Sequence, residues 1–371
     1  MTFNPAAHFS ATYVEARERF VAAATTRGLA LSRHVHPDAR GANGEELSID
    51  VACMGAADAS SVLILISGTH GAEGFCGSGA QVGLLHDERF LRATADARVV
   101  MVHALNPYGF SHLRRTNEDN VDLNRNFRDY STPIPANTAY ADVHDFIVPA
   151  TWPPGPDDVA RLKSYVARHG LAGLQAAVTG GQCEYPDGLF YGGVRPAWSN
   201  GVLRQVLRDE ASQCATLGWI DFHTGLGPRG HGEKIFAGGN DDDADLARTR
   251  RWWGKEVTSF VDGTSTSAPL TGVNFKAVSD ECSQAAFAGI ALEYGTLPVL
   301  EVLDALRADQ WLANTPAASP VQRAAIKRQI RDAFYQDADD WKAMVYDQAL
   351  ASALAGLDAM TTATATAGSG R

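Results

Sequence analysis

The sequence predicts an α/β fold: a single domain built on a central mixed, mostly parallel sheet with helices on both faces. Residues 61–67 (SVLILIS) and 98–105 (RVVMVHAL) are continuous apolar runs, which is typical of strands buried on both faces. A glycine-rich turn and a helical pattern through AQVGLL separate these runs, so the order is strand, helix, strand. Residues 217–223 and 289–295 repeat the apolar strand pattern and extend the same sheet.

The first half of the chain predicts one more helix, one more strand and a long excursion. Apolar positions at helical spacing cover residues 12–28, and Gly28 should end this helix. LSIDVAC at 47–53 alternates as a strand does. Residues 130–200 are rich in Pro, Gly and aromatic side chains, so we expect loops and short helices laid over the sheet. Such an excursion is either part of a substrate pocket or a surface insertion.

The second half of the chain predicts mainly helices after the last strands. Residues 243–261 have a helical pattern, and 299–358 are mostly helical by spacing. The low-complexity tail, 359–371, is expected to be disordered. We therefore expect one domain that covers residues 1–358.

Composition narrows the possible partners. The formal net charge of −11 over 371 residues argues against nucleic acid, because such binding depends on Lys and Arg that neutralise phosphates. No apolar stretch is long enough for a signal peptide or a membrane span, so no membrane partner is expected. The five cysteines include no C-x-x-C pair, which favours a reducing compartment over a disulfide framework. These features predict a cytoplasmic protein and leave its oligomeric state unknown.

The stretch ISGTHGAEGFCGSG, at 66–79, suggests a metal site. His70 and Glu73 lie three positions apart where a helix begins, so they face the same side and can reach one ion. Gly71 and its neighbouring glycines allow the sharp turn that this requires. Alone, such a pair is more often a surface contact. The glycine spacing argues against a phosphate loop, since it differs from G-x-G-x-x-G and no G-K-[ST] follows.

A catalytic zinc ion usually takes three protein ligands, and His223 is the best candidate for the third. It ends the apolar strand of WIDFHTGLG, where ligands collect at the edge of an α/β sheet. It is either a ligand or a hydrogen-bonded residue at a strand end.

The remaining histidines are poorer candidates for a metal ligand. His34 and His36 alternate before a proline and are expected to face solvent, and His103 lies inside a strand. His231 follows a flexible RGHG segment and could reach a pocket.

The segment LRRTNEDNVDLNRNF, at 113–127, is too polar for a core strand. Its arginines suit bidentate capture of a carboxylate, with Asn as an adjacent donor. Asp122 could accept the far N–H of a metal-bound histidine and so hold its ring. The alternative is a solvated surface loop.

Glu293 is a carboxylate within the apolar strand GIALEYG. Buried Glu is costly unless it is paired or functional, and burial raises its pKa, which suits a group that moves a proton. It is either a general base or a core residue paired with an arginine.

In this order, the motifs resemble the zinc carboxypeptidase superfamily, which also contains succinylglutamate desuccinylases and aspartoacylases. The motifs are HGAE (His70, Glu73), NPYG at 106–109, RR and DLNRNF within 114–127, DFH ending at His223, and LEYG with Glu293. The likeness spans about residues 45–300. From GEELSIDVACMG to EYGTLP the chain looks closer still to an uncharacterised bacterial branch of that superfamily.

The resemblance implies a zinc-carboxypeptidase-like domain that holds one zinc ion. His70, Glu73 and His223 would be the ligands, and Glu293 would be the general base and acid that activates the zinc-bound water. Asp122 matches the hydrogen-bond partner of the first histidine.

The same resemblance implies residues that bind the substrate. Asn124 and Arg125 would clamp its terminal carboxylate. Arg115 would polarise the carbonyl group that is attacked, with Arg114 as the fallback for this role.

The function implied is that of a zinc-dependent hydrolase of carboxypeptidase type, which cleaves an amide bond next to a free carboxylate in a small peptide. The alternative is an N-acyl-amino-acid amidohydrolase, similar to aspartoacylases and desuccinylases. A lesser alternative is an inactive zinc-binding module. Peptidase members have a mobile Tyr between the third ligand and the catalytic Glu, but residues 224–292 contain none, and Tyr294 cannot simply take that role.

Overall fold

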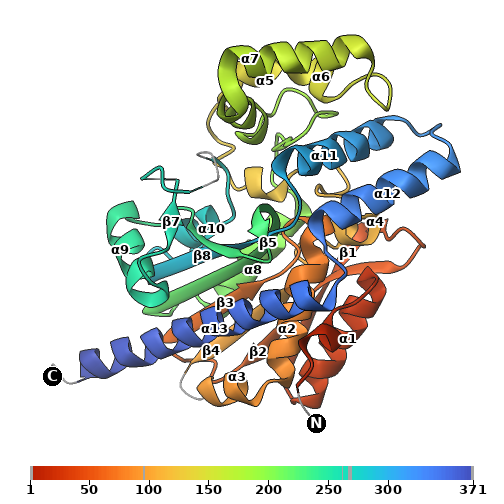
Figure 1. Cartoon of the computed structure of the whole chain (residues 1–371). Coiled ribbons are helices and arrows are strands. Elements are labelled where there is room, and N and C mark those ends of the chain that lie inside the picture. The colour runs from red at the N-terminus through yellow and green to blue at the C-terminus, as the bar shows by residue number, and fades with distance from the viewer. Residues whose placement is uncertain (1–2, 95–96, 261, 266–269, 369–371) are drawn as a thin grey trace.

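An eight-stranded mixed sheet forms the centre of the molecule (Figure 1). The computed structural model describes residues 3–94, 97–260, 262–265 and 270–368. The strands are β1 (Ala30–Arg40), β2 (Glu46–Met54), β3 (Ser61–Ile66), β4 (Arg98–His103), β5 (Thr216–Arg229), β6 (Gly232–Phe236), β7 (Thr258–Ser259) and β8 (Ala286–Gly295).

The order of the strands is β1-β2-β4-β3-β5-β8-β6-β7. Strands β4, β3, β5 and β8 run parallel to one another, as do β6 and β7, whereas β1–β2, β2–β4 and β6–β8 are antiparallel pairs. Every residue of β3 and β4 is buried, which is why these two strands are continuous apolar runs in the sequence. The expected α/β class and the mixed, mostly parallel sheet are confirmed.

The connections between strands are mainly helical. The α-helices are α1 (Tyr13–Thr26), α2 (Gly74–His86), α3 (Glu88–Ala93), α4 (Pro107–His112), α5 (Thr138–Ala141), α6 (His144–Ile147), α7 (Pro156–Thr179), α8 (Trp198–Glu210), α9 (Asp242–Trp253), α10 (Lys276–Glu281), α11 (Val299–Asn314), α12 (Pro320–Phe334) and α13 (Asp339–Gly368). Three 3₁₀ turns are η1 (Pro5–His8), η2 (Gly71–Glu73) and η3 (Leu123–Arg125).

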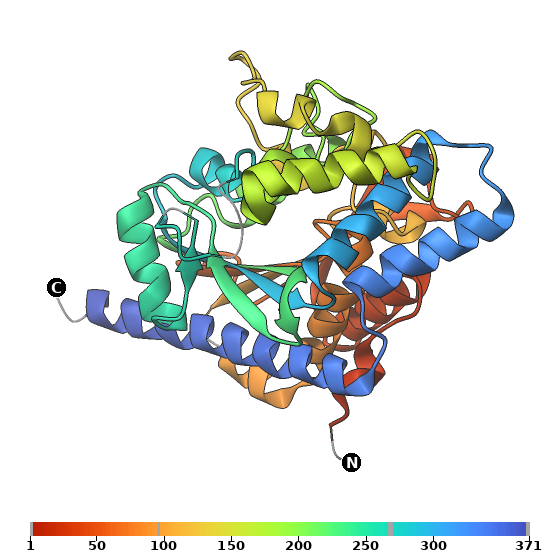
Figure 2. The ribbon, with the colours of Figure 1, turned by 45° about the horizontal axis from the view of Figure 1, so that its top comes forward.

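Helices cover both faces of the sheet. On one face α2 packs against β4 and β5, and α13 packs against β3 and β5. Alternate side chains of β5 show the two faces, since Phe222 contacts α2 at Gly77 while Trp219 packs against Phe275 with 5.5 Å between ring centroids. Phe275 immediately precedes α10, and α10 packs against α8. Figure 2 shows α13 below the sheet and α7 above it.

The excursion at 130–200 differs from the expected loops and short helices. It contains α7, a helix of 24 residues that starts at Pro156 with two acidic residues in its first turn. Both features stabilise a helix N-terminus. The helix is bent at Gly170, whose φ of 70° lies outside the helical range. The excursion therefore places a long amphipathic helix above the sheet, rather than only loops.

The disorder expected for the tail is not found in the part of it that the structure describes. Helix α13 continues from Asp339 to Gly368, so residues 359–368 extend a helix, and 369–371 lie outside the described residues. Residues 359–368 only continue a helix that has already formed from Asp339 onward, and extending a helix costs less free energy than starting one.

Among the other predicted features, α1 and β2 are present near their expected bounds, and all five cysteines are free thiols. The solvent-facing position expected for His36 is wrong. His36 lies in β1 and is buried, and its Nδ1 accepts the backbone N–H groups of Asp38 and Ala39. None of the described helices is long and apolar enough to cross a bilayer.

Candidate metal centre

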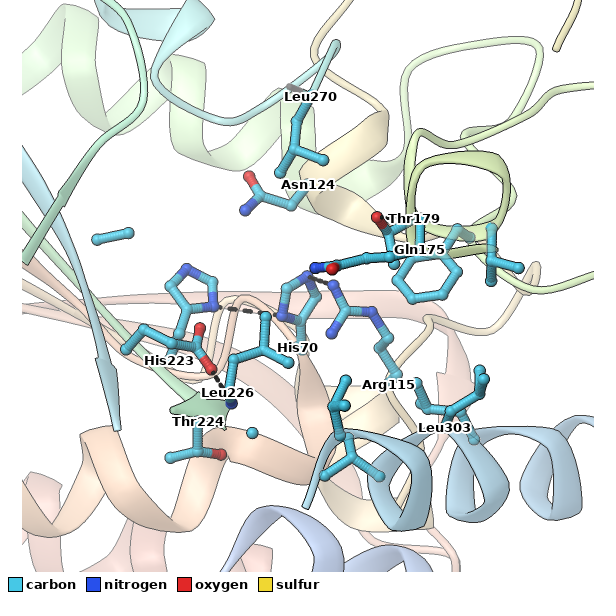
Figure 3. Close-up of a pocket in the computed structure, with 18 of the residues that line it drawn as sticks. His70, Arg115, Asn124, Gln175, Thr179, His223, Thr224, Leu226, Leu270 and Leu303 are labelled. Carbon is cyan, nitrogen blue, oxygen red and sulfur yellow. Dashed lines mark hydrogen bonds between the residues drawn. The ribbon is translucent and has the colours of Figure 1, made fainter. Parts of the chain in front are cut away.

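His70, Glu73 and His223 meet at the carboxyl ends of β3 and β5. Figure 3 shows the two imidazoles of this cluster next to each other. The two imidazoles approach through their Nδ1 atoms, which are 3.2 Å apart. Glu73 Oε1 lies 2.9 Å from Nδ1 of His70, and Oε2 lies 3.1 Å from Nδ1 of His223. Ligand atoms around a tetrahedral ion with bonds of about 2.1 Å lie about 3.4 Å apart, so this donor set fits a small divalent cation.

Two aspartates hold the far nitrogens of the imidazoles. Nε2 of His223 lies 2.8 Å from Asp221 Oδ2, and Nε2 of His70 lies 3.2 Å from Asp122 Oδ1. A carboxylate in this position keeps the proton on Nε2 and leaves Nδ1 as a lone-pair donor. The prediction for Asp122 matches this geometry, but the equivalent role of Asp221 was missed, although the D-x-H spacing was visible in the sequence.

Asn274 is a second residue that sequence reasoning missed. Its side-chain Nδ2 donates to Asp221 Oδ2 at 2.6 Å, while its backbone N–H donates to Asn124 Oδ1 at 2.9 Å. Thr69, next to His70 in sequence, also donates to Asp221 through its hydroxyl group, at 2.9 Å. Asn274 therefore links the support of one histidine to Asn124, across 150 positions of sequence. No sequence motif indicates such a contact.

The three buried groups of the cluster stabilise one another electrostatically. Burial disfavours the charge of Glu73, but the adjacent His70 and His223 outweigh it and hold the pKa of this carboxyl below its ordinary value. Burial likewise disfavours the charged form of His223, but Asp221 and Glu73 raise its pKa well above the ordinary value.

Glu293 stands beside His223, because these two residues are paired directly across β5 and β8. Its Oε1 accepts the backbone N–H of Leu226 at 2.9 Å. Burial, and then the negative charge of Glu73, raise the pKa of Glu293 to about 7. A carboxyl group with this pKa can both take and return a proton near neutral pH.

Arg115 lies against the cluster. Its Nε donates to Asp122 Oδ2 at 2.9 Å and its Nη1 to Glu73 Oε1 at 3.1 Å. Nη2 lies 2.8 Å from His70 Nε2. The two contacts of His70 Nε2 are alternatives, because this nitrogen donates to Asp122 when it carries the proton and accepts from Arg115 only when it does not.

Arg125 is buried without a carboxylate partner among the described residues. Its Nε and Nη2 donate to the carbonyl of Thr179 at 2.9 and 2.5 Å, and Nη1 donates to the carbonyl of Asn124 at 2.8 Å. Burial lowers its pKa to about 10, against the opposing effect of Asp122. Because Arg125 and Asn124 both line the cavity over the metal cluster, they are suited to an anionic ligand.

Arg114 does not line the cavity, so its predicted role as a fallback for Arg115 is wrong. Its guanidinium points away, toward α11, where Nε donates to Asp309 Oδ2 at 3.1 Å. Lys327 of α12 binds the other oxygen of Asp309 at 2.7 Å. Neighbouring residues in this irregular segment point in opposite directions, which the sequence alone could not decide.

The cavity above the cluster is lined mainly by apolar side chains, and its empty volume is about 1250 Å³ including the part open to solvent. Leu171, Leu174 and Val178 of α7 form part of its wall, so the excursion does contribute to the pocket. Their i, i+3, i+7 spacing could have indicated this face. His231 is exposed and lies outside the lining.

No tyrosine lines the cavity in the part of the chain that the structure describes. Tyr294 points to the other face of the sheet and donates to the carbonyl of Val345 in α13 at 3.0 Å. Among the aromatic residues, Phe190, Phe260, Phe275 and Phe334 line the cavity.

Comparison with known families then gives one match, over residues 9–348, to the family described as "Protein of unknown function (DUF2817)". The chain belongs to this family. The matched range of the DUF2817 chain includes all the residues of the cluster and of the cavity wall named above. No curated protein matches it.

Solved structures similar to this DUF2817 chain include carboxypeptidase A from Helicoverpa armigera, with 12% identity, a TM-score of 0.46 and coverage of 87% of this chain and 74% of that chain. A metallo-carboxypeptidase from Pseudomonas aeruginosa has 16% identity, a TM-score of 0.37 and coverage of 90% and 68%. A succinylglutamate desuccinylase from Silicibacter sp. TM1040 has 13% identity, a TM-score of 0.37 and coverage of 82% and 65%. These are the groups that the sequence motifs resemble.

Proposed function

We propose that this protein is a zinc-dependent hydrolase of carboxypeptidase type, which cleaves an amide bond next to a free carboxylate. One observation supports this most directly: two imidazole Nδ1 atoms and a carboxylate converge within about 3 Å of one another, with Glu293 beside them. A structural zinc site would have four protein ligands, whereas this set has three and opens into a cavity.

His70, Glu73 and His223 would hold one zinc ion, which when bound would polarise the substrate carbonyl and lower the pKa of a water molecule. Glu293 then takes the proton of the attacking water and passes it to the leaving amine. Its position beside His223 and its pKa of about 7 suit both halves of this transfer.

Arg115 would stabilise the negative charge that develops on the attacked carbonyl oxygen. Once Nδ1 of His70 is a ligand, Nε2 carries the proton, so Arg115 loses one acceptor and its guanidinium becomes available to the substrate. Arg125 and Asn124 would bind the substrate carboxylate, which supplies the negative charge that buried Arg125 lacks.

An N-acyl-amino-acid amidohydrolase is the second candidate. It uses the same ligands, base and carboxylate clamp, and it differs only in the group on the acyl side of the amide. The absence of a tyrosine from the described lining favours it over a typical peptidase.

The test is metal analysis of the purified protein, combined with a mass-spectrometric screen of small peptides and N-acyl amino acids. We expect about one zinc ion per chain and hydrolysis of at least one of these classes. Glu293→Gln should reduce the rate by about 10²–10⁴-fold or more while zinc remains bound. The matched control is Glu301→Gln, an exposed carboxylate of α11, which should be active. Zinc retention with no amide hydrolysis by the unmodified protein would refute the proposal in favour of a zinc-binding module.

A further inference from the structure

The cavity has few charges, and the proposed reaction uses all of them. Apart from the two histidines of the cluster, the charged residues of its described lining are Arg115, Arg125 and Glu293. No further carboxylate is present there to pair with the ammonium group of an unblocked peptide. No further cation is present to bind a second carboxylate. Because an unpaired charge is costly in such a site, the lining favours a substrate whose single charge is its terminal carboxylate.

The two ends of the cavity differ in their exposure. At one end Ile235, Val273 and Phe275 are buried, and Ile235 is paired with Ala291, two positions before Glu293 on β8. These lining residues are therefore the more buried ones. Figure 3 shows Leu270 and Leu303 on different sides of His70.

The other end is open and apolar. Leu171 of α7 is 49% exposed, and Val299 and Leu300 at the start of α11 are 47% and 48% exposed. All three line the cavity. Large apolar side chains grouped in this way at the mouth of a site indicate that a ligand covers them.

We infer that the substrate is an amino acid with an apolar, uncharged N-acyl group, and that this acyl group lies between α7 and α11. This inference rests on the proposed function. The amino-acid part ends at its carboxylate, so it fits the buried end, where the backbone N–H of Asn274, between Val273 and Phe275, donates to Asn124 Oδ1. Arg125, next to Asn124, reaches from there to the carbonyl of Thr179. The acyl part then extends past the scissile amide toward the open end, where it covers the exposed leucines.

The experiment measures kcat/KM of the zinc-loaded protein for N-acetyl-, N-butanoyl- and N-octanoyl-L-leucine, and for unblocked L-leucyl-L-leucine. Because each buried methylene group adds to binding, kcat/KM should rise about tenfold or more from acetyl to octanoyl. The unblocked dipeptide should be the poorest substrate. A second readout is binding of the same compounds to Glu293→Gln, measured by calorimetry, in which the Kd should fall in the same order.

A double variant tests where the acyl group binds. Leu171→Gln combined with Leu300→Gln should lower the octanoyl-to-acetyl ratio of kcat/KM about fivefold or more, because it makes the open end polar. Both side chains are half exposed, so folding should tolerate the change. The matched control is Val159→Gln, since Val159 is a partly exposed residue of the same helix outside the lining, and it should leave the ratio unchanged.

The outcomes separate this inference from the proposed function. If N-acetyl-L-leucine is hydrolysed but longer acyl chains bring no gain, or if the unblocked dipeptide is the best substrate, the acyl inference is overturned and the hydrolase stands. If none of the four compounds nor any other amide is hydrolysed by zinc-loaded protein, both fail. Chain-length dependence that the double variant removes supports both.

Discussion

At the residue scale, the site is organised by which nitrogen of each imidazole carries the proton. Asp122 and Asp221 occupy the Nε2 side of His70 and His223, so both Nδ1 atoms face the same point. Asn274 and Thr69 in turn hold Asp221. These buried hydrogen bonds orient the two imidazoles and would reduce the reorganisation needed to bind a metal ion there.

The raised pKa of Glu293 predicts how kcat/KM depends on pH. A general base must be ionised, and the pKa of Glu293 is raised to about 7, so kcat/KM should rise with pH through an acid limb and then level off. A divalent cation on the adjacent ligands favours the carboxylate, so the limb of the zinc-loaded protein should lie below about 7. The measurement is kcat/KM from about pH 5 to about pH 8.5.

Metal content measured at each pH is the control, because loss of zinc from protonated histidines would also lower the rate in acid. A rate that falls as pH rises across the acid limb, with zinc fully bound, would contradict the role of Glu293 as a base.

At the scale of the elements, the ligand turn depends on a close contact between two backbone segments. Gly71 opens η2, and its backbone N–H and that of Ala72 donate to the carbonyls of Arg115 and Arg114 at 3.3 and 2.8 Å. Gly109 of α4 lies directly behind the turn. The metal-ligand turn and the segment with Arg115 are therefore one structural unit, although they are about forty positions apart in sequence.

Gly71→Ala should break this unit. A Cβ at Gly71 would lie 1.9 Å from the carbonyl carbon of Gly109 and 2.2 Å from the nitrogen of Phe110, so the backbone itself must move. We expect a loss of stability of about 1–3 kcal/mol and weaker zinc retention. Denaturant unfolding and metal analysis measure the two effects.

The matched control is Gly201→Ala on the exposed face of α8, where a Cβ meets nothing within 4 Å. It should leave zinc binding unchanged and cost no stability, because alanine favours a helix. A stable, zinc-loaded Gly71→Ala protein would show that the close approach is not required.

At the scale of the whole molecule, the proposed metal ligands join distant parts of the chain. His70 and Glu73 follow β3, whereas His223 lies near the end of β5, 150 positions after Glu73. An ion that binds these residues only in the folded state should stabilise the entire domain, by about 4 kcal/mol at a free concentration of about 1,000 times Kd.

Zinc should therefore raise the Tm of metal-free protein in a concentration-dependent way, and a chelator should reverse the shift. Calorimetry measures both. Magnesium is the control, because it prefers oxygen ligands and should have little effect on a site with two imidazoles. If saturating zinc leaves Tm unchanged, the cluster does not bind the ion in the folded state.

The sequence by itself predicted five strands of the sheet, β2, β3, β4, β5 and β8, and the residues of the cluster, but not β1, β6 or β7. Strands β3 and β4 are buried throughout and β5 and β8 are mostly buried, so these strands are largely apolar, and a polar residue near the end of such a strand is conspicuous. His223 and Glu293 stand out for that reason, whereas His70 and Glu73 stand out in the glycine-rich turn that follows β3. The structure brings all four together at the carboxyl ends of the parallel strands.

Only the tertiary structure decided what surrounds the cluster. Whether Arg114 or Arg115 faces the cavity depends on the rotation of an irregular segment, and the support from Asn274 depends on a loop that arrives from another part of the fold. The place of α7 above the site depends on its packing against α5 and α6, which the local pattern does not show. The spacing of residues in a sequence shows which side chains lie close together within one helix, strand or turn. It does not show which distant segments come into contact, and such contacts form the wall of the cavity.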